Sequence, residues 1–237
     1  MLPEAVPQHP PALAHHFDDL AQQHEAATLG MWLFLVTEVL FFGGLFLVYL
    51  IYRRAYPDAF AAASRALDIR LGTINTAVLI ASSLTMALAV HAAQLGRRST
   101  LMWFLVATMA LGGVFLGIKG VEYSRKFAEH HVPGPSFQFE PDHQPGEKPV
   151  PIQKDIVRHA QIFFSLYFVM TGLHAVHMIV GLGIMSFMCW WAWRGTITAT
   201  YYSPIEISGL YWHFVDIVWI FLFPLLYLIG RHGHQAV

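Results

Sequence analysis

The sequence predicts an all-α fold, a polytopic membrane bundle with five transmembrane helices, and two observations support this prediction. Hydrophobic residues make up 56% of the 237 residues and charged residues only 12%, which is half of the roughly 25% charged share of a soluble domain. Five segments also have the length of about 20 mostly apolar residues that a membrane-spanning helix needs. They cover residues 28–52, 74–95, 101–122, 160–193 and 207–230.

The polar ends of the chain lie outside the predicted membrane domain at residues 28–230. Residues 1–27 form a polar N-terminal arm, in which a short amphipathic helix is expected at residues 13–23. The arm has no Lys or Arg and no apolar run of the needed length, so it lacks the pattern of a signal peptide. Residues 231–237 form a short C-terminal tail.

Four polar segments connect the predicted helices. Residues 53–73 contain four arginines, residues 96–100 form a tight turn around Gly96, and residues 194–206 form a shorter connection. Residues 123–159 contain six prolines, which lack a backbone N–H and interrupt regular helices. That segment is therefore predicted to be a long extramembrane loop that faces a partner.

Composition and motifs exclude several classes of function. The formal net charge of −1 gives no basic surface for nucleic acid. The nucleophile elbow and the glycine-rich phosphate loops are absent from the sequence. The single cysteine, Cys189, lies in an apolar run, where a thiol usually serves as a small packing group.

Glu38 is the most unusual residue of the first helix, because its stretch "TEVLFFGGLF" is otherwise apolar. A charged side chain at the centre of a spanning helix costs about 2.5–3.5 kcal/mol on insertion scales. Apolar surroundings therefore favour the neutral, protonated form of the acid. Two interpretations remain open, namely a neutral acid that bonds across a helix interface, and a proton-relay or lipid-headgroup contact.

Two pairs of ionisable residues lie three apart on a helix, which places each pair on one face. Lys119 and Glu122 are expected to pair on the third helix. His213 and Asp216 are expected to form an imidazole–carboxylate bond on the fifth helix, which satisfies two buried groups at once. This structural interpretation is favoured over direct catalysis, and no catalytic residue is predicted.

His174 and His177 share a face of the fourth helix, which raises the question of a metal site. A catalytic metal needs three or more protein ligands, and no HExxH, CxxC or acidic motif accompanies this pair. We therefore predict no metal ligand in the chain and assign the imidazoles to hydrogen bonds between helices. Gly113 and Gly117, four residues apart on the third helix, are expected to let neighbouring backbones approach closely.

Five fragments, in order along residues 28–230, resemble subunit III of the heme–copper oxidases, and specifically of the bacterial cytochrome c oxidases. The fragment "LVTEVLFFGGLF" resembles the family's Glu-bearing helix, and "GVEYSRKF" resembles its Glu-Tyr helix end. The fragments "TGLHAVHMIVG" and "YWHFVDIVWIFLF" resemble the family's two-histidine helix and its last helix. In "LGTINTAVLIASSLTMALAVHAA", the residues Asn75, Ser82 and His91 match family positions and are expected to serve helix packing.

The resemblance implies an accessory role in an oxidoreductase complex of aerobic respiration. The family's subunit binds no heme or copper, packs against the catalytic subunit I, holds lipid and supports proton uptake. We therefore expect heme and copper in partner subunits and bound phospholipid on this chain. We also expect contacts with subunit I and other oxidase subunits, and the complex can be part of a larger respiratory supercomplex. The matching residues are expected to be proton- or lipid-related: Glu38, Glu122, His174, His177, Glu206, His213 and Asp216.

The sequence differs from the family pattern in three features, one of which concerns the lipid site. The sequence lacks the two N-terminal helices that form a lipid cleft in the seven-helix members of the family, so a neighbouring subunit is expected to supply the missing wall. Ala175 stands where the family usually has Gly. The segment at residues 123–159 is also longer than usual, which fits a docking element.

Three alternative functions remain open. The first is subunit III of a quinol oxidase, although the acid in "TEVLFF" favours the cytochrome c branch, since the quinol branch resembles "SDC" there. The second is the subunit-III-like accessory protein of nitric oxide reductase. The third, from another class, is a stand-alone proton-coupled transporter, which the sequence does not favour because it shows neither paired repeats nor broken helices.

The expected location is the bacterial inner membrane, and two arguments on orientation conflict. An N-terminus in the cytoplasm leaves three basic residues on the cytoplasmic side, Arg97, Arg98 and Arg194, and ten on the opposite side. The positive-inside rule therefore places the N-terminus outside, whereas the family arrangement places it inside. We follow the family arrangement, because basic loops can pair with acidic partner subunits.

Overall fold

The computed structural model describes residues 13–134, 137–139 and 154–228. In these ranges, five helices are long and apolar enough to cross a membrane, so the predicted all-α class is confirmed. They are α1 (Leu20–Ala55), α3 (Ile69–Gln94), α4 (Arg98–Ala128), α5 (Lys154–Arg194) and α6 (Ser203–Phe223). A short helix, α2 (Pro57–Arg65), follows α1, and the π-helical turn η1 (Pro224–Leu228) extends α6.

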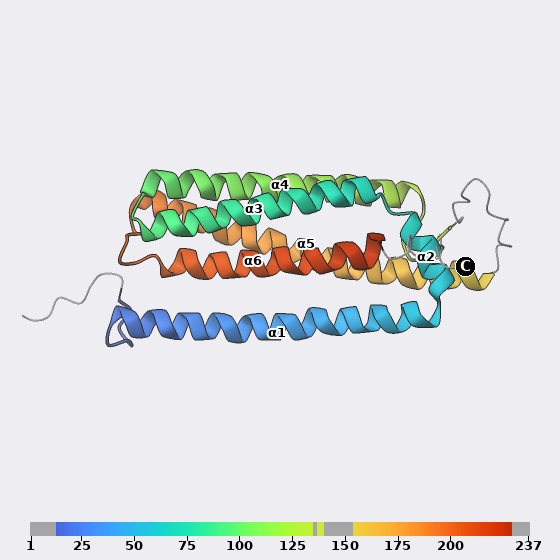
Figure 1. The fold of residues 1–237 in the computed structure, drawn as a ribbon, viewed down its shortest axis with the longest axis horizontal. Helices are drawn as coiled ribbons and strands as arrows, with labels where there is room; N and C mark the ends of the chain where they lie inside the picture. The colour runs from blue at the N-terminus through green and yellow to red at the C-terminus, as the bar shows by residue number, and fades with distance from the viewer. Residues whose placement is uncertain (1–12, 135–136, 140–153, 229–237) are drawn as a thin grey trace, which may run out of the picture.

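Helices α3, α4, α5 and α6 form a four-helix bundle, and α1 lies along one side of it (Figure 1). Within the bundle, α3 packs on α4 and α6, and α5 packs on the same two helices. Helix α1 contacts α5 and α6. The outermost helix is therefore joined to the bundle mainly through the two C-terminal helices.

Two glycines end spanning helices at the same end of the bundle as the start of α1 (Figure 1). Gly96 follows α3 with a φ of 67°, and Gly195 follows α5 with a φ of 82°. Both values lie in the left-handed region, which glycine adopts without steric cost and which commonly ends a helix. The predicted tight turn around Gly96 is therefore present and connects α3 to α4.

Aspartates begin two of the spanning helices. The Asp19 side chain accepts a hydrogen bond from the Gln22 backbone N–H at 2.7 Å, and Asp68 accepts one from Arg70 at 2.9 Å. Such caps satisfy backbone donors that have no partner within the helix. The cap at Asp19 starts α1 at Leu20, so the separate amphipathic helix expected at residues 13–23 does not form.

Helices also extend into two segments that the sequence assigned to connections. Helix α4 continues to Ala128 and α5 begins at Lys154, so both ends of the expected loop at residues 123–159 are helical. The expected link at residues 53–73 contains α2, in which Pro57 occupies the first turn. Proline suits this position because the N–H that it lacks would have no partner there. Residues 140–153 of the expected loop lie outside the described residues.

Pro224 marks the change from α6 to the π-helical turn η1. Proline provides no N–H and its ring crowds the preceding turn, which disturbs the regular helical hydrogen bonds. Side chains from the N-terminal part of the chain bond to carbonyl groups of this turn. The Tyr49 hydroxyl donates to the Leu225 carbonyl and the Ser64 hydroxyl to the Leu226 carbonyl, which ties η1 to α1 and α2.

Close helix packing centres on the buried indole of Trp212. A Cβ on Gly112 would lie 2.9 Å from Cη2 of Trp212, and a Cβ on Gly181 would lie 2.8 Å from Cζ3. Glycine is therefore required on α4 and α5 for the indole to fit. The glycines predicted to serve this purpose, Gly113 and Gly117, are exposed. A Cβ on either one would meet no atom of another helix within 4 Å in the described part of the chain, so neither allows a close helix approach here.

Candidate functional site

Glu38 of α1 lies against His177 of α5. The Nε2 atom of His177 is 3.1 Å from Oε2 of Glu38, and both side chains are 18% exposed. The Phe42 ring packs edge-on against the same imidazole, with ring centroids 5.3 Å apart. The acid that the sequence singled out therefore has an imidazole partner on a neighbouring helix.

The other ring nitrogen of His177 fixes where the protons lie. Nδ1 is 2.8 Å from the Leu173 carbonyl oxygen, which can only accept a hydrogen bond. Nδ1 must therefore carry a hydrogen, and a neutral imidazole then has a bare lone pair on Nε2. The bond to Glu38 requires one proton between Nε2 and Oε2, held either by the acid or by the imidazole. The pair is neutral in both cases.

A groove of about 420 Å³ opens beside this pair, between α1 and the two C-terminal helices. Glu38 and His177 line it together with Tyr211, whose hydroxyl donates to the His177 carbonyl at 2.9 Å. The remaining lining is apolar apart from Ser208: Met31, Phe34, Val176, Val180, Ile184 and Ile207. Such a groove can hold a hydrocarbon chain with one polar contact at its wall.

Lys119 and Glu122 form the predicted ion pair on α4. Lys119 Nζ donates to Glu122 Oε2 at 2.9 Å, and both residues are buried. Two tyrosines complete the site. The Tyr167 hydroxyl donates to Glu122 Oε1 at 2.9 Å, and the Tyr227 hydroxyl donates to the same atom while it accepts from Lys119 at 2.8 Å.

This ion-pair cluster is well satisfied for a charged group inside the bundle. Each oxygen of Glu122 accepts a hydrogen bond, and the Lys119 ammonium also lies 4.8 Å from the Trp219 ring centre. A buried charge is tolerated when its partners supply hydrogen bonds and opposite charge. The cluster joins α4, α5 and η1, so its arrangement fits a structural role at one end of the bundle.

His174 and His177 contact different helices, although they share a face of α5. The His174 ring packs against Phe115 of α4 and Trp219 of α6, with centroids 5.5 and 5.2 Å away. Neither of its ring nitrogens makes a hydrogen bond within the described residues. The interhelical hydrogen bond expected of the histidine pair is therefore present only at His177.

His213 and Asp216 do not form the expected imidazole–carboxylate bond. Nδ1 of His213 is instead 2.8 Å from the hydroxyl oxygen of Ser83 on α3. Both oxygens of Asp216 are buried and make no hydrogen bond within the part of the chain that the structure describes. Residues three apart share a face, but here a hydroxyl on the neighbouring helix takes the imidazole.

The residues expected to serve helix packing fall into three environments. Ser82 is buried, and its hydroxyl oxygen accepts from the Trp212 indole N–H at 3.0 Å. Asn75 is also fully buried, but its amide makes no hydrogen bond within the described residues. His91 lies exposed near the end of α3, so it does not pack between helices of this chain.

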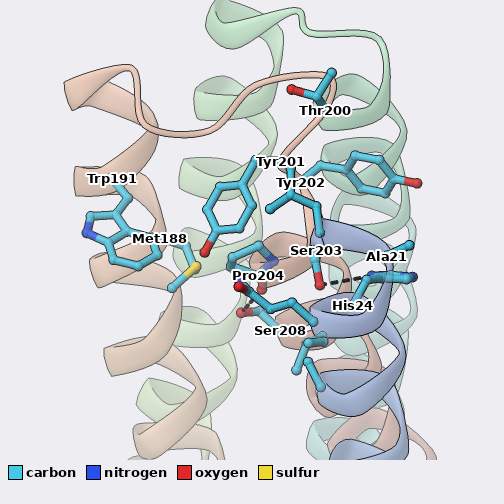
Figure 2. A pocket seen from close by; sticks show the side chains of 14 residues that line it. Ala21, His24, Met188, Trp191, Thr200, Tyr201, Tyr202, Ser203, Pro204 and Ser208 are labelled. Carbon is cyan, nitrogen blue, oxygen red and sulfur yellow. Dashed lines mark hydrogen bonds between the residues drawn. The ribbon is translucent and has the colours of Figure 1, made fainter. Parts of the chain in front are cut away.

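A separate pocket of about 550 Å³ lies at the end of the bundle where α6 begins, and His24 of α1 lines it (Figure 2). Glu206 is not part of its lining but lies beside His24. Nδ1 of His24 is 3.0 Å from the Ser203 hydroxyl oxygen, and its Nε2 is 3.9 Å from Glu206 Oε2. Tyr201 and Trp191 line the same pocket. Aromatic residues with polar tips are typical of the membrane–water interface.

His131 lies just beyond α4, outside the spanning segments. Its ring stacks on Phe164 with a centroid distance of 4.9 Å, and its Nδ1 is 3.0 Å from Glu129 Oε2. Burial lowers the pKa of His131 from its ordinary value, and the nearby positive charge of Lys126 lowers this pKa further. His131 therefore binds a proton less readily in the folded chain than in the unfolded chain.

No group of three or more His, Cys, Asp or Glu that could hold a metal ion occurs within residues 13–134, 137–139 and 154–228. The expectation that the chain carries no metal stays a prediction. The sequence does not predict Tyr167, Tyr227 or Ser83 as site residues, because no local pattern links them to the ionisable residues that they contact. Their only signal is a polar group in an otherwise apolar helix.

The fold and its buried polar contacts define a polytopic membrane protein with α-helical spans. The chain belongs to the cytochrome c oxidase subunit III family. A sequence model described as "Cytochrome c oxidase subunit III" matches residues 15–130 and 156–231, which include most of all five spans. The predicted family is thereby confirmed, and the family is part of an oxidoreductase complex with other oxidase subunits.

Curated relatives cover nearly the whole chain and carry two kinds of name. "Cytochrome c oxidase subunit 3" of Thermostichus vulcanus is 29% identical over 90% of this chain and 92% of its own length. The protein of the same name from Alkalihalophilus pseudofirmus is 31% identical over 86% and 87%. "Quinol oxidase subunit 3" of Bacillus subtilis is 27% identical over 86% and 88%.

Proposed function

We propose that the chain is the non-redox subunit III of a proton-pumping bacterial cytochrome c oxidase, which stabilises the catalytic subunit I, holds lipid and supports proton uptake. The ordered family match over both matched ranges carries this proposal. The contact between Glu38 and His177 supports the proton-related part, because it places a shareable proton next to a groove. Heme and copper belong to the partner subunits in this proposal.

The groove beside Glu38 supports the lipid-related part of the proposal. Its apolar lining suits a phospholipid acyl chain, and α1 forms one wall of it. A lipid there would hold α1 against α5 and α6. A neighbouring subunit would cover the open side of this groove.

A quinol oxidase is the second candidate, because relatives of both names match at similar identity. The acid at position 38 favours the cytochrome c type in our proposal. The two candidates differ in the electron donor. Oxygen consumption by the purified complex with reduced cytochrome c supports the first candidate, and activity with a quinol alone supports the second.

We also propose that the chain lies in the bacterial inner membrane with its N-terminus in the cytoplasm. The loop that contains His143 is then on the opposite side. A His143→Cys variant, with Cys189 replaced by Ala, should react with a membrane-impermeant thiol reagent only from the periplasmic side. Reaction only from the cytoplasmic side would show that the N-terminus lies outside, as the positive-inside rule predicts.

Deletion of the chain from the producing organism tests the proposed role. The remaining complex should keep its heme and copper and its initial turnover, since no redox ligand is assigned to this chain. Its active lifetime during turnover should shorten, because proton uptake and subunit I lose their support. Loss of the heme or copper centres on deletion would contradict the proposed role.

A further inference from the structure

A second groove lies between α3 and α6, on a different face of α6 from the groove beside Glu38. It has a volume of about 410 Å³. Three polar residues line it, Ser83, His213 and Asp216. Its rim is apolar and exposed, with exposed fractions of 56% at Ile80, 62% at Leu84, 51% at Ile217 and 44% at Ile220.

Asp216 is the unsatisfied member of this groove. The residue is only 3% exposed, and neither carboxyl oxygen makes a hydrogen bond within the described residues. Ser83 lies close enough to interact with Asp216, and its oxygen is also 2.8 Å from Nδ1 of His213. The single Ser83 hydroxyl hydrogen can serve at most one carboxyl oxygen, so at least one oxygen of Asp216 has no donor within the described residues. The groove therefore presents a hydrogen-bond acceptor that this chain leaves without a donor.

The depth of Asp216 in the membrane restricts what can supply that donor. The residue lies near the middle of the span Ser203–Leu228, about 20 Å from each end at 1.5 Å per residue. Water and lipid headgroups do not reach this depth, and an unsatisfied polar group there costs several kcal/mol. A lipid acyl chain fills such a groove but has no donor, whereas a helix of another protein can provide one.

Exposed apolar side chains do not by themselves identify a docking face on this protein. Leu40 of α1 and Trp103 of α4 are 71% and 73% exposed, as expected for side chains that face lipid. What distinguishes the α3–α6 groove is the buried acid beneath its rim. The partner that fits is complementary to Asp216 in hydrogen bonding or in charge.

We propose that the α3–α6 groove is the docking surface for a transmembrane helix of a partner oxidase subunit, and that this helix places a hydrogen-bond donor on Asp216. The proposal rests on the proposed function, in which the chain works inside an oxidase complex. Ile80, Leu84, Ile217 and Ile220 then pack around the incoming helix. The single hydrogen of the Ser83 hydroxyl can reach at most one of the two Asp216 oxygens, so the other oxygen remains available to the partner.

Site-specific photo-crosslinking in the intact complex tests the docking surface. The photoreactive residue p-benzoylphenylalanine is placed at Ile217 or Leu84, with Leu40 and Trp103 as control positions on α1 and α4. We expect covalent adducts with a partner subunit from both groove positions, at least fivefold above either control. Equal or stronger protein adducts from the controls, or only lipid adducts from the groove positions, would overturn the proposal.

Retention of two Asp216 variants tests the proposed donor. The complex is captured through a tag on another oxidase subunit, and the ratio of this chain to heme is measured after a detergent wash. Asp216→Leu removes both acceptors and should lower this ratio about tenfold or more, whereas Asp216→Asn keeps one acceptor and should stay within about twofold of wild type. If the Asp216→Leu chain stays in the complex at the wild-type ratio to heme, the partner helix does not donate a hydrogen bond to Asp216.

The proposed function and the proposed docking surface fail on different results. A tagged copy of this chain that purifies without heme contradicts the proposed function. A heme-containing complex in which the adducts map to α1 or α4 leaves that function intact and rejects only the α3–α6 surface.

Discussion

Nε2 of His177 lies 3.1 Å from Oε2 of Glu38, across 139 residues of sequence. This contact joins the outermost helix, α1, to α5 at a point where the groove beside it is otherwise mostly apolar. Because Nδ1 of His177 faces a carbonyl oxygen, one proton must lie between the imidazole and the acid. The pair has no net charge whether the proton lies on the acid or on the imidazole.

Glu38→Gln removes the titratable group but keeps the size of the side chain and one hydrogen bond to His177. We expect initial turnover of the oxidase to be unchanged and its active lifetime to fall toward that of the complex without this chain. Oxygen consumption followed over many turnovers measures both quantities. Glu129→Gln, at a 45% exposed acid beyond α4, is the matched control. A lifetime equal to wild type in Glu38→Gln would reduce Glu38 to a packing residue.

The Lys119–Glu122 cluster should respond to the loss of one charge more strongly than to the loss of both. Lys119→Met leaves a buried carboxylate without its cation, which should lower the free energy of unfolding by about 3–5 kcal/mol. Adding Glu122→Gln should restore part of this loss, because no uncompensated charge then remains. Unfolding in detergent, followed by intrinsic fluorescence, measures the difference.

The control for this cluster is Arg125→Met on the same helix, since Arg125 is 59% exposed. That variant should change the free energy of unfolding by less than about 0.5 kcal/mol. A double variant that is as unstable as the sum of the two single variants would show that Lys119 and Glu122 are not coupled.

Gly112 and Gly113 offer a matched test of packing around Trp212. A Cβ at Gly112 would meet the indole at 2.9 Å, whereas Gly113 has open space. Gly112→Ala should therefore lower stability by about 1–3 kcal/mol, as overpacked sites do, and Gly113→Ala should be neutral or stabilising by up to about 1 kcal/mol, because alanine favours helix. Thermal unfolding of the two variants measures the contrast, and equal stabilities would contradict the packing described for Trp212.

His131 should make stability depend on pH near neutrality. Burial and Lys126 lower its pKa in the folded chain, while the unfolded chain keeps the ordinary value of about 6.5. The stabilisation is then complete above about pH 6.5 and decreases as pH falls toward the folded pKa, since the unfolded state binds the extra proton. His131→Phe keeps the ring stacked on Phe164 and removes the proton site, so its unfolding temperature should fall less between about pH 7.5 and about pH 5. An identical decrease in both proteins would exclude His131 as a cause.

The sequence predicted the five spans because hydrophobic length is a local property, but it placed the helix ends poorly. Helices α1 and α4 continue through polar residues that a hydropathy window excludes, and α1 begins at a cap that depends on Asp19. Extramembrane turns of a spanning helix carry no apolar signal. Helix α2 was not predicted for the same reason, because it lies within a polar segment rich in arginine.

The ionisable sites were predictable only where both partners lie on one helix. The spacing of Lys119 and Glu122 predicted their contact, but the tyrosine partners Tyr167 and Tyr227 lie 45 and 105 residues from Glu122. The spacing of His213 and Asp216 was equally suitable, yet a hydroxyl on another helix took the imidazole. The spacing of two residues shows that they share a face of their helix. Which hydrogen bonds they make depends on the side chains of the helix that packs against that face.

Purification of the complex through a tag on this chain tests the central claim most directly. We expect a heme absorption spectrum and, on a gel, a larger subunit in a constant ratio to this chain. The same preparation should consume oxygen with an added electron donor. A chain that purifies alone, without heme absorbance or a larger partner, would contradict its assignment as subunit III of an oxidase.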